Sequence, residues 1–445
     1  MRRLWRAIRW LLLALLVLVG GVLALNLVDD RLDPGAKAML EARVETVPRQ
    51  ENLYYMALGF GTTGNDPEQA GWDEAQSVGE DLRSGKNVYD LFNLKRPEQL
   101  QLVGKHEDLP RSGDLQGAID LLRRDPELVG RFLSENARLR ERYDRLHVYT
   151  RFVSAIPDGE IAIVQPEWGL MFEGQRLEML ELARKVVAGR TGEVVDWLNR
   201  DAAFWRRMLA EAHPSMSDKF MLGIFLRRDF QMASQLVHAG HLDAAQLEGL
   251  SQVATSLSEA ERSMAGVWEV EFRKFVLETS ASSAPSSPES LSDRLQRLWG
   301  QPFYLRNATI NRMYRNTLAL QEASGHACSR FEADRAGLLN ATSPATWNTL
   351  RNSGGAILSS IAMPVDLDYV SHTCDLQGFQ RLLALQILLR QRAPGDADIP
   401  ALIRSAGAEY MDPYSDAPMR WVPEQRALGF GARSGGARGS LPWAI

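Results

Sequence analysis

The chain has 445 residues, of which 45% are hydrophobic and 24% are charged. These proportions are typical of globular proteins and exclude a wholly disordered, collagen-like or multi-span membrane protein. The net charge is −5, and four arginines precede the first acidic residue, Asp29. The rest of the chain is therefore still more acidic, so we expect no nucleic acid partner.

The N-terminus predicts a transmembrane helix. Four arginines in the first ten residues precede an almost wholly apolar run, 11–28. As a helix this run would be about 27 Å long, close to the hydrocarbon thickness of a bilayer. Since arginines favour the cytoplasmic side, residues 1–28 are expected to be a cytoplasmic stub and membrane anchor, with the bulk of the chain periplasmic. The alternative is a signal peptide cleaved after Val22-Leu23-Ala24.

Residues 29–50 are polar and lack clear periodicity, so we interpret them as a tether. A helical pattern follows. Asp66-Pro67-Glu68 predicts a helix start, with Asp66 as the N-cap and Pro67 in the first turn. The segment 113–146 predicts two helices, the second restarting at Asp125-Pro126. Further helices are expected at 176–188, 191–199, 204–212, 215–238 and 258–278.

In the last of these helices, Met264, Trp268, Phe272 and Phe275 recur at helical spacing and predict a core-facing side. The Ser- and Pro-rich segment 280–290 then predicts a linker. It would separate an N-terminal helical domain from a C-terminal one. These domains are expected at 51–279 and 291–445.

In the C-terminal domain, helices are expected at 291–299, 307–322 and 376–392. The helix at 376–392 is amphipathic, so we interpret it as a core helix and not a second membrane span. Two short strands are predicted around Pro423-Glu424-Gln425. The predicted fold class is mainly α: an N-terminal transmembrane helix, an irregular multi-helix ectodomain and a short β-hairpin near the C-terminus.

Cys328 and Cys374 are the only cysteines, and an even count in an oxidising compartment predicts a disulfide bond. A rival interpretation is a metal site, because His326 and His372 each precede one of the cysteines by two residues. The usual zinc spacing is different, and a one-residue gap makes chelation by both side chains awkward. We therefore expect the disulfide and no metal ligands.

Two glycine-rich segments resemble nucleotide-binding motifs. Gly59-Phe-Gly61-Thr-Thr-Gly64, followed by Glu80 and Asp81, matches the dinucleotide fingerprint, but the chain lacks the alternating strands and helices that make this motif work. Gly79 to Lys86 resembles a phosphate loop with one residue too many between its glycines, and Asn87 replaces the Ser or Thr that would bind magnesium. We interpret the two segments as a turn and a helix end, and expect no cofactor.

Carboxylate chemistry is harder to exclude. Asp158, Glu160, Glu167 and Glu173 lie in or beside an irregular stretch that could line a groove. The alternative is a solvated loop, which the sequence favours because nothing pairs these acids. The pattern of lytic transglycosylases is not met, because the only Glu-Ser pair, at Glu289, falls in the predicted linker. No catalytic residue is therefore assigned.

Several segments resemble a group of uncharacterised proteobacterial envelope proteins with a single N-terminal span. The matching pieces are 52–60 after the anchor, the aromatic helical middle, the helix 376–392 and Asp412-Pro-Tyr-Ser-Asp-Ala-Pro-Met-Arg-Trp421. The resemblance implies an envelope location and a helical fold, and it implies no activity.

Three classes of function remain: a non-catalytic binding or scaffold module, an enzyme acting on cell-wall polymers through unrecognised carboxylates, and a sensor. A cytoplasmic stub of about ten residues is too short for the output domain that a sensor needs. The absence of catalytic motifs favours the binding module over the enzyme. The expected protein is thus a single-pass protein of the bacterial inner membrane whose partner is another envelope protein.

Overall fold

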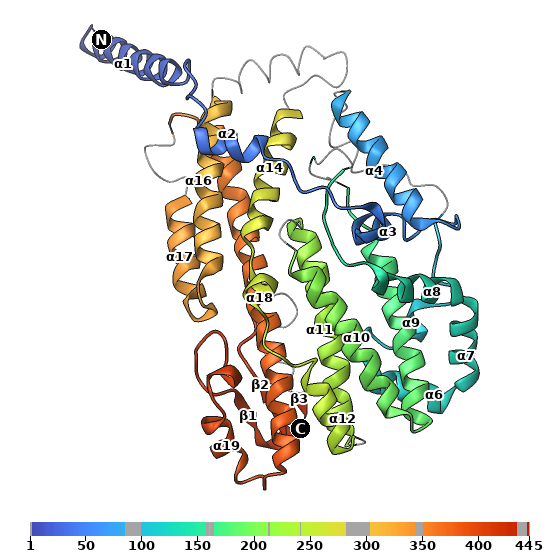
Figure 1. The fold of residues 1–445 in the computed structure, drawn as a ribbon. Helices are drawn as coiled ribbons and strands as arrows, with labels where there is room; N and C mark the ends of the chain where they lie inside the picture. The colour runs from blue at the N-terminus through green and yellow to red at the C-terminus, as the bar shows by residue number, and fades with distance from the viewer. Residues whose placement is uncertain are drawn as a thin grey trace. The chain divides into compact units, whose positions relative to one another are not determined.

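The computed structural model describes residues 2–84, 99–156, 160, 164–211, 214–240, 242–281, 303–342, 350–433 and 443–444 (Figure 1). The chain forms two compact units, each made of separate stretches. Unit 1 comprises 1–42, 272–323 and 332–368, and unit 2 comprises 43–271, 324–331 and 369–445. The stretch 291–445, expected as one domain, contributes to both units. Most of the predicted linker, 282–290, and the helix expected at 291–299 lie outside the described residues.

Unit 1 is helical and is built around a small apolar core. Ala36 of α2 packs with Phe272 and Val276 of α14 and with Ile310 and Met313 of α16. The helices of unit 1, of which α14, α16 and α18 continue beyond its limits, are α1 (Arg2–Leu25), α2 (Pro34–Glu41), α14 (Ala265–Ala281), α16 (Arg306–Gly325), α17 (Phe331–Thr342) and α18 (Ser353–Arg392).

The segment expected to be a tether, 29–50, is packed. Helix α2 begins where Asp33 accepts a hydrogen bond from the backbone nitrogen of Gly35 at 2.7 Å. Ala36 of this helix is fully buried in unit 1, and Val44 lies in an apolar cluster of unit 2. Leu32 and Met39 flank Ala36 at helical spacing, so an apolar pattern was present but too short to stand out among polar residues.

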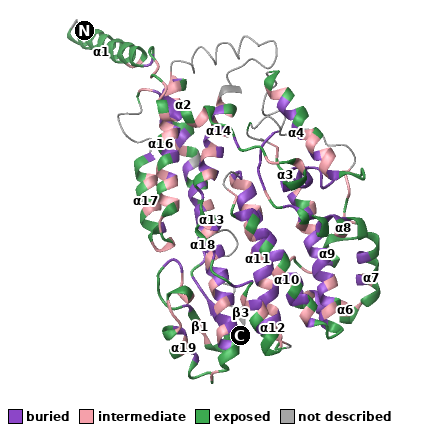
Figure 2. Cartoon of the chain, in the orientation of Figure 1, coloured by how far each residue is buried: buried purple, intermediate pink, exposed green. Residues whose placement is uncertain are grey.

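Unit 2 is a larger helical assembly in which α9, α10 and α11 carry many of the buried residues (Figure 2). Its centre is aromatic: the rings of Trp205 and Phe225 stack with centroids 4.1 Å apart. Its further helices are α3 (Leu53–Leu58), α4 (Pro67–Arg83), α6 (Leu115–Arg124), α7 (Pro126–Glu135), α8 (Ala137–Arg145), α9 (Trp168–Val187), α10 (Thr191–Leu209), α11 (Met216–Ala239), α12 (Ala244–Ser251), α13 (Glu259–Arg262) and α19 (Ile399–Ser405). Short 3-10 turns occupy Arg49–Glu51, His106–Asp108, Leu146–Val148, Cys328–Arg330, Ala408–Tyr410 and Pro423–Gln425.

The helix starts predicted from capping residues are confirmed. Asp66 accepts a hydrogen bond from the backbone nitrogen of Gln69 at the start of α4, and Asp125 caps α7 in the same way. The segment 113–146 contains three helices instead of two. The extra break falls at Asn136, whose buried side chain exchanges two hydrogen bonds with the backbone of Val103.

The two helices expected at 191–199 and 204–212 are one helix, α10. The sequence suggested a gap because Arg200 and Asp201 interrupt the apolar pattern, yet Asp201 is fully buried and hydrogen-bonded. Helix α18 likewise begins at Ser353, far before the expected start at Leu376, and passes through Pro364. Of the side chains expected to face the core at 258–278, Met264, Trp268 and Phe272 are buried, and Phe275 packs against the cluster of unit 1 that contains Phe272.

The predicted hairpin is confirmed. Strands β1 (Arg420–Val422) and β2 (Ala427–Gly429) pair in antiparallel register, with Trp421 opposite Leu428, and Pro423–Gln425 form the turn between them. A third strand, β3 (Trp443–Ala444), pairs with the other edge of β2. The strand character of the chain is thus confined to its C-terminal end among the residues that the structure describes.

Cys328 and Cys374 lie at disulfide-bonding distance, with their sulfur atoms 2.08 Å apart, and join a 3-10 turn to α18 within unit 2. In the described part of the chain, no group of three or more His, Cys, Asp or Glu side chains is placed to hold a metal ion. The ring of His372, one of the two histidines of the rival metal site, instead packs against Phe220 at 4.3 Å.

Candidate functional site

The carboxylates singled out from the sequence do not converge on one site. Glu173 lies on α9, where its two oxygens are 3.2 Å from His106 Nδ1 and 3.3 Å from Arg176 Nη1. Glu167 accepts a hydrogen bond from Gln99 Nε2 at 2.5 Å, and Glu160 is exposed. Asp158 lies outside the described residues. Glu167 and Glu173 thus serve local ion pairs and hydrogen bonds.

The glycine-rich turn 59–64 presents carbonyl oxygens to a buried arginine. Arg142 Nη1 donates to the carbonyl oxygens of Phe60 and Thr62, and Nη2 donates to that of Gly64, at 2.5–2.6 Å. Burial lowers the pKa of Arg142 to about 10, with neighbouring Arg138 adding to the shift. A phosphate-binding loop presents backbone N–H groups, so this turn has the opposite polarity.

A pair of fully buried carboxyl groups, which the sequence analysis missed, lies in the core of unit 2. Asp201 of α10 accepts hydrogen bonds from Tyr143 Oη at 3.0 Å, Trp205 Nε1 at 3.1 Å and Gln175 Nε2 at 3.3 Å. The same glutamine nitrogen lies 3.2 Å from Asp229 Oδ1 of α11. We call Asp201 and Asp229 the buried acid pair.

The surroundings of Asp229 favour its neutral, protonated form. Burial raises the pKa of Asp229 well above its usual range, and the adjacent charge of Asp201 raises it further. Oδ2 of Asp229 receives no hydrogen bond from the residues described, which fits a protonated oxygen that itself donates to Asp201. Both side chains are fully buried and are hydrogen-bonded within the core of unit 2.

A histidine at the edge of the core completes this network. His147 Nε2 lies 2.7 Å from Asp201 Oδ1. Burial disfavours the charged imidazole, but the hydrogen bond and charge of Asp201 outweigh this, so the pKa of His147 is raised. One sequence signal could have revealed the pair: Asp201 follows Leu198 and precedes Trp205 at helical spacing on the apolar face of α10.

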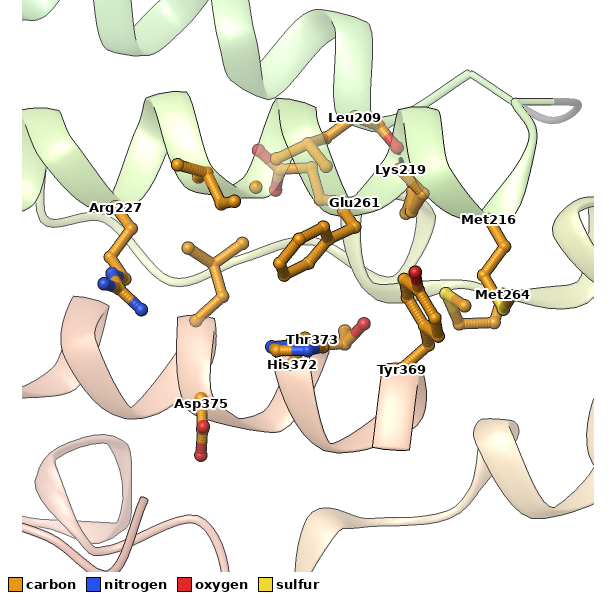
Figure 3. Close-up of a pocket in the computed structure, with 14 residues that line it drawn as sticks. Leu209, Met216, Lys219, Arg227, Glu261, Met264, Tyr369, His372, Thr373 and Asp375 are labelled. Atoms are coloured by element: carbon orange, nitrogen blue, oxygen red, sulfur yellow. Dashed lines mark hydrogen bonds between the residues drawn. The ribbon is translucent and has the colours of Figure 1, made fainter. Parts of the chain in front are cut away.

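A pocket with several charged groups on its wall lies in unit 2 between α11 and the part of α18 that follows Asp368 (Figure 3). Its cavity volume is about 40 Å³. Apolar side chains of Phe220, Ile224 and Leu376 line it, together with charged groups that include Lys219 and Arg227. A second, wider cavity of about 230 Å³ lies beside Gln380 and Tyr410 in unit 2, and the only charged residue on its wall, Glu409, is exposed.

Lys219 has a structural role at one end of the first pocket. Its side chain points to α10 and donates to the carbonyl oxygen of Leu209, the last residue of that helix (Figure 3). Burial lowers the pKa of Lys219 to about 7, with Glu261 opposing the shift. The amine therefore satisfies a helix-terminal carbonyl group that would otherwise lack a donor.

Helix α1 is long and apolar enough to cross a membrane, and none of it is buried. It ends at Leu25, slightly before the predicted limit at residue 28, because the next residue turns its side chain to unit 1. Asn26 Nδ2 donates to the carbonyl oxygen of Leu350 at 3.0 Å, and its Oδ1 accepts from the backbone nitrogen of Asn352 at 2.7 Å.

Two acidic residues extend this contact. Asp29 accepts hydrogen bonds from the backbone nitrogens of Asn307 and Ala308 in the first turn of α16, at 2.8 and 3.0 Å. Asp30 forms an ion pair of 2.7 Å with Arg351. The end of α1 is thus joined to α16 and to the start of α18 by hydrogen bonds, and we call this the Asn26–Asp30 contact.

An exposed apolar surface begins directly after the residues of α18 that take part in the Asn26–Asp30 contact. The sequence holds no charged residue between Arg351 and Asp366. On the first part of α18, in unit 1, four large apolar side chains share one face at helical spacing, and their exposed fractions run from 42% to 66%. This α18 apolar face consists of Ile357, Leu358, Ile361 and Val365.

Comparison of the chain with protein-family models, with curated proteins and with solved structures finds no match.

Proposed function

We propose that this chain is a single-pass inner-membrane protein, anchored by α1 with its bulk in the periplasm, that serves as a non-catalytic binding or scaffold module. Its partner would be another envelope protein, in keeping with the envelope location that the resemblance to single-span proteobacterial proteins implies. The observation that carries the proposal is the α18 apolar face, which a soluble protein would have reason to bury.

The occupant that we propose for this face is an apolar helix of a protein in the same membrane. The Asn26–Asp30 contact joins Leu350 and Asn352, which directly precede the face, to the end of α1. If α1 spans the membrane, the face therefore starts close to the bilayer surface. The face occupies one side of a single helix and carries no charged residue, which suits packing against one apolar helix. A groove for a polar polymer would need hydrogen-bonding side chains in these positions.

The location follows from charge and redox chemistry. The arginines at the start of α1 favour the cytoplasm, which sends the remaining chain outward. The disulfide distance of Cys328 and Cys374 suits an oxidising compartment. The buried acid pair and the paired state of Glu167 and Glu173 give no support to a carboxylate enzyme.

The topology predicts the behaviour of reporter fusions. A periplasm-active reporter joined to the C-terminus of the full chain should be active, and a cytoplasm-active reporter at the same position should be silent. Replacing the four N-terminal arginines with glutamate should reduce this asymmetry, because the retained positive charge sets the orientation. The opposite pattern would refute the periplasmic location, and release of the protein without detergent would show that α1 is removed.

The partner surface predicts site-specific crosslinking. A benzophenone amino acid at position 361 should form an adduct in living cells, and mass spectrometry should map it to an apolar segment of a different membrane protein. The same group at Ala336, which is exposed on α17 of unit 1, should form none. The charged substitution Ile357→Glu should abolish the adduct from position 361 and change stability by less than about 0.5 kcal/mol, because Ile357 is half exposed.

Other adducts would overturn the choice of occupant. Adducts to lipid alone would assign the face to the bilayer surface, and adducts to the same chain alone would make it a self-association surface. An equal yield from positions 336 and 361 would show that the α18 apolar face selects no partner.

A further inference from the structure

Arg227 of α11 carries a charge without a hydrogen-bonding anion. Its Nε atom is buried and has no acceptor, and no hydrogen bond or ion pair joins the guanidinium to any described residue. The contact it does make is with the ring of Phe379, 5.2 Å away. Burial lowers the pKa of Arg227, and the charge of Asp375 opposes this shift in part. A charge held in this way costs free energy until an anion joins it.

Arg227 also lines the first pocket, where Figure 3 shows its guanidinium lying between α11 and α18. Both acids on the pocket wall accept hydrogen bonds from residues other than Arg227, although Asp375 also attracts Arg227 through its charge. Glu261 forms an ion pair of 2.6 Å with Arg206, and Asp375 accepts hydrogen bonds from Tyr414 Oη at 2.7 Å and from the backbone nitrogen of Arg433. Lys219, the other cation, is directed to Leu209. Arg227 is therefore the described pocket cation that can receive a ligand.

Most of the remaining wall is apolar, although Tyr369, His372 and Thr373 also line it, and the space is small. Phe220, Ile224, Met264 and Leu376 surround it, and its volume of about 40 Å³ equals the space of roughly three water molecules. A guanidinium binds a carboxylate through two parallel hydrogen bonds, and the apolar wall favours a short hydrocarbon chain over a second charge. We propose that this pocket is a binding site for a small monocarboxylate, whose carboxylate pairs with Arg227 and whose alkyl chain lies between α11 and α18.

Thermal unfolding of the full-length protein in detergent tests this site with butyrate as the probe. At several times its dissociation constant, butyrate should raise the unfolding midpoint by about 2–4 °C. Butyramide, which has the same shape and no charge, and sodium chloride at equal ionic strength should leave the midpoint unchanged. Arg227→Gln should remove the butyrate shift and should unfold no earlier than the parent protein without ligand, because the uncompensated charge is gone.

Arg228→Gln is the matched control. Arg228 is the next residue of α11, but its guanidinium lies over the ring of Phe172 at 3.9 Å and is not on the pocket wall, so the butyrate shift should persist in this variant. No butyrate shift in the parent protein, or an equal shift in Arg227→Gln, would overturn the proposal. An equal shift with butyramide would reassign the pocket to uncharged ligands, and an equal shift with inorganic phosphate would show general anion binding. None of these outcomes depends on the partner of the α18 apolar face.

Discussion

Asp201→Asn should lower the free energy of unfolding by about 3–5 kcal/mol, because it weakens the acceptor of a fully buried network. The carboxylate of Asp201 receives hydrogen bonds from Tyr143, Gln175 and Trp205, and an asparagine NH₂ group would face some of these donors. Asp229→Asn should raise the free energy of unfolding, because asparagine reproduces a protonated carboxyl group that accepts from Gln175 and donates to Asp201. Urea unfolding followed by tryptophan fluorescence would measure both changes.

The same network predicts how stability depends on pH. The folded-state pKa values of Asp229 and His147 are both raised. A raised folded pKa contributes stability below the unfolded pKa that is lost as pH rises through the folded value. For Asp229 this loss begins above about pH 4, and for His147 it begins above about pH 6.5. Asp229 and His147 thus both make stability fall with rising pH, so the parent protein should be more stable at about pH 6 than at about pH 8.

Asp229→Asn should flatten this dependence, and a residual slope from His147 should remain. An equal pH dependence of stability in Asp229→Asn and the parent protein across this range would show that Asp229 is ionised in the core. A parent protein that becomes more stable with rising pH would contradict the raised pKa values of the pair.

Gly71→Ala should destabilise unit 2 by about 2–4 kcal/mol. Helices α3 and α4 cross at glycines: a Cβ atom at Gly71 would overlap the carbonyl oxygen of Tyr55, and one at Gly59 would overlap that of Pro67. Because the obstacles are backbone atoms, no rotamer change can relieve the overlap. The two helices would have to separate, which would expose Tyr55 and its neighbours on α3.

Gly130→Ala is the control for the general effect of replacing glycine with alanine, which lowers the conformational entropy of the unfolded chain. Gly130 lies in α7 and a Cβ atom there would meet nothing within 4 Å, so this change should raise stability by about 0.5–1 kcal/mol. Thermal unfolding of both variants separates the two effects. If Gly71→Ala were as stable as Gly130→Ala, the close crossing of α3 and α4 would be refuted.

The sequence determined the features that depend on neighbouring residues. Asp66 and Asp125 each cap a helix within three or four positions, so their spacing alone predicts where α4 and α7 begin. The β-hairpin around Pro423 and the apolar length of α1 are equally local. The predicted mainly helical class followed from such signals. The pairing of Cys328 with Cys374 was predictable because no other cysteine competes.

Only the tertiary structure decided the features that depend on distant partners. In the sequence, Asp201 interrupts an apolar pattern. In the structure, it accepts a hydrogen bond from Tyr143, which lies 58 positions away and could not be identified as its partner from the sequence. The sequence predicts a tether at 29–50, but in the structure Asn307 and Phe272 of unit 1 contact this segment. Glu167 and Glu173, chosen from sequence, serve a hydrogen bond and ion pairs. Arg227, which has no hydrogen-bonded anion among the described residues, looked in the sequence like any other arginine. A residue type fixes which contacts are favourable, but burial and the surrounding partners fix which of them are made.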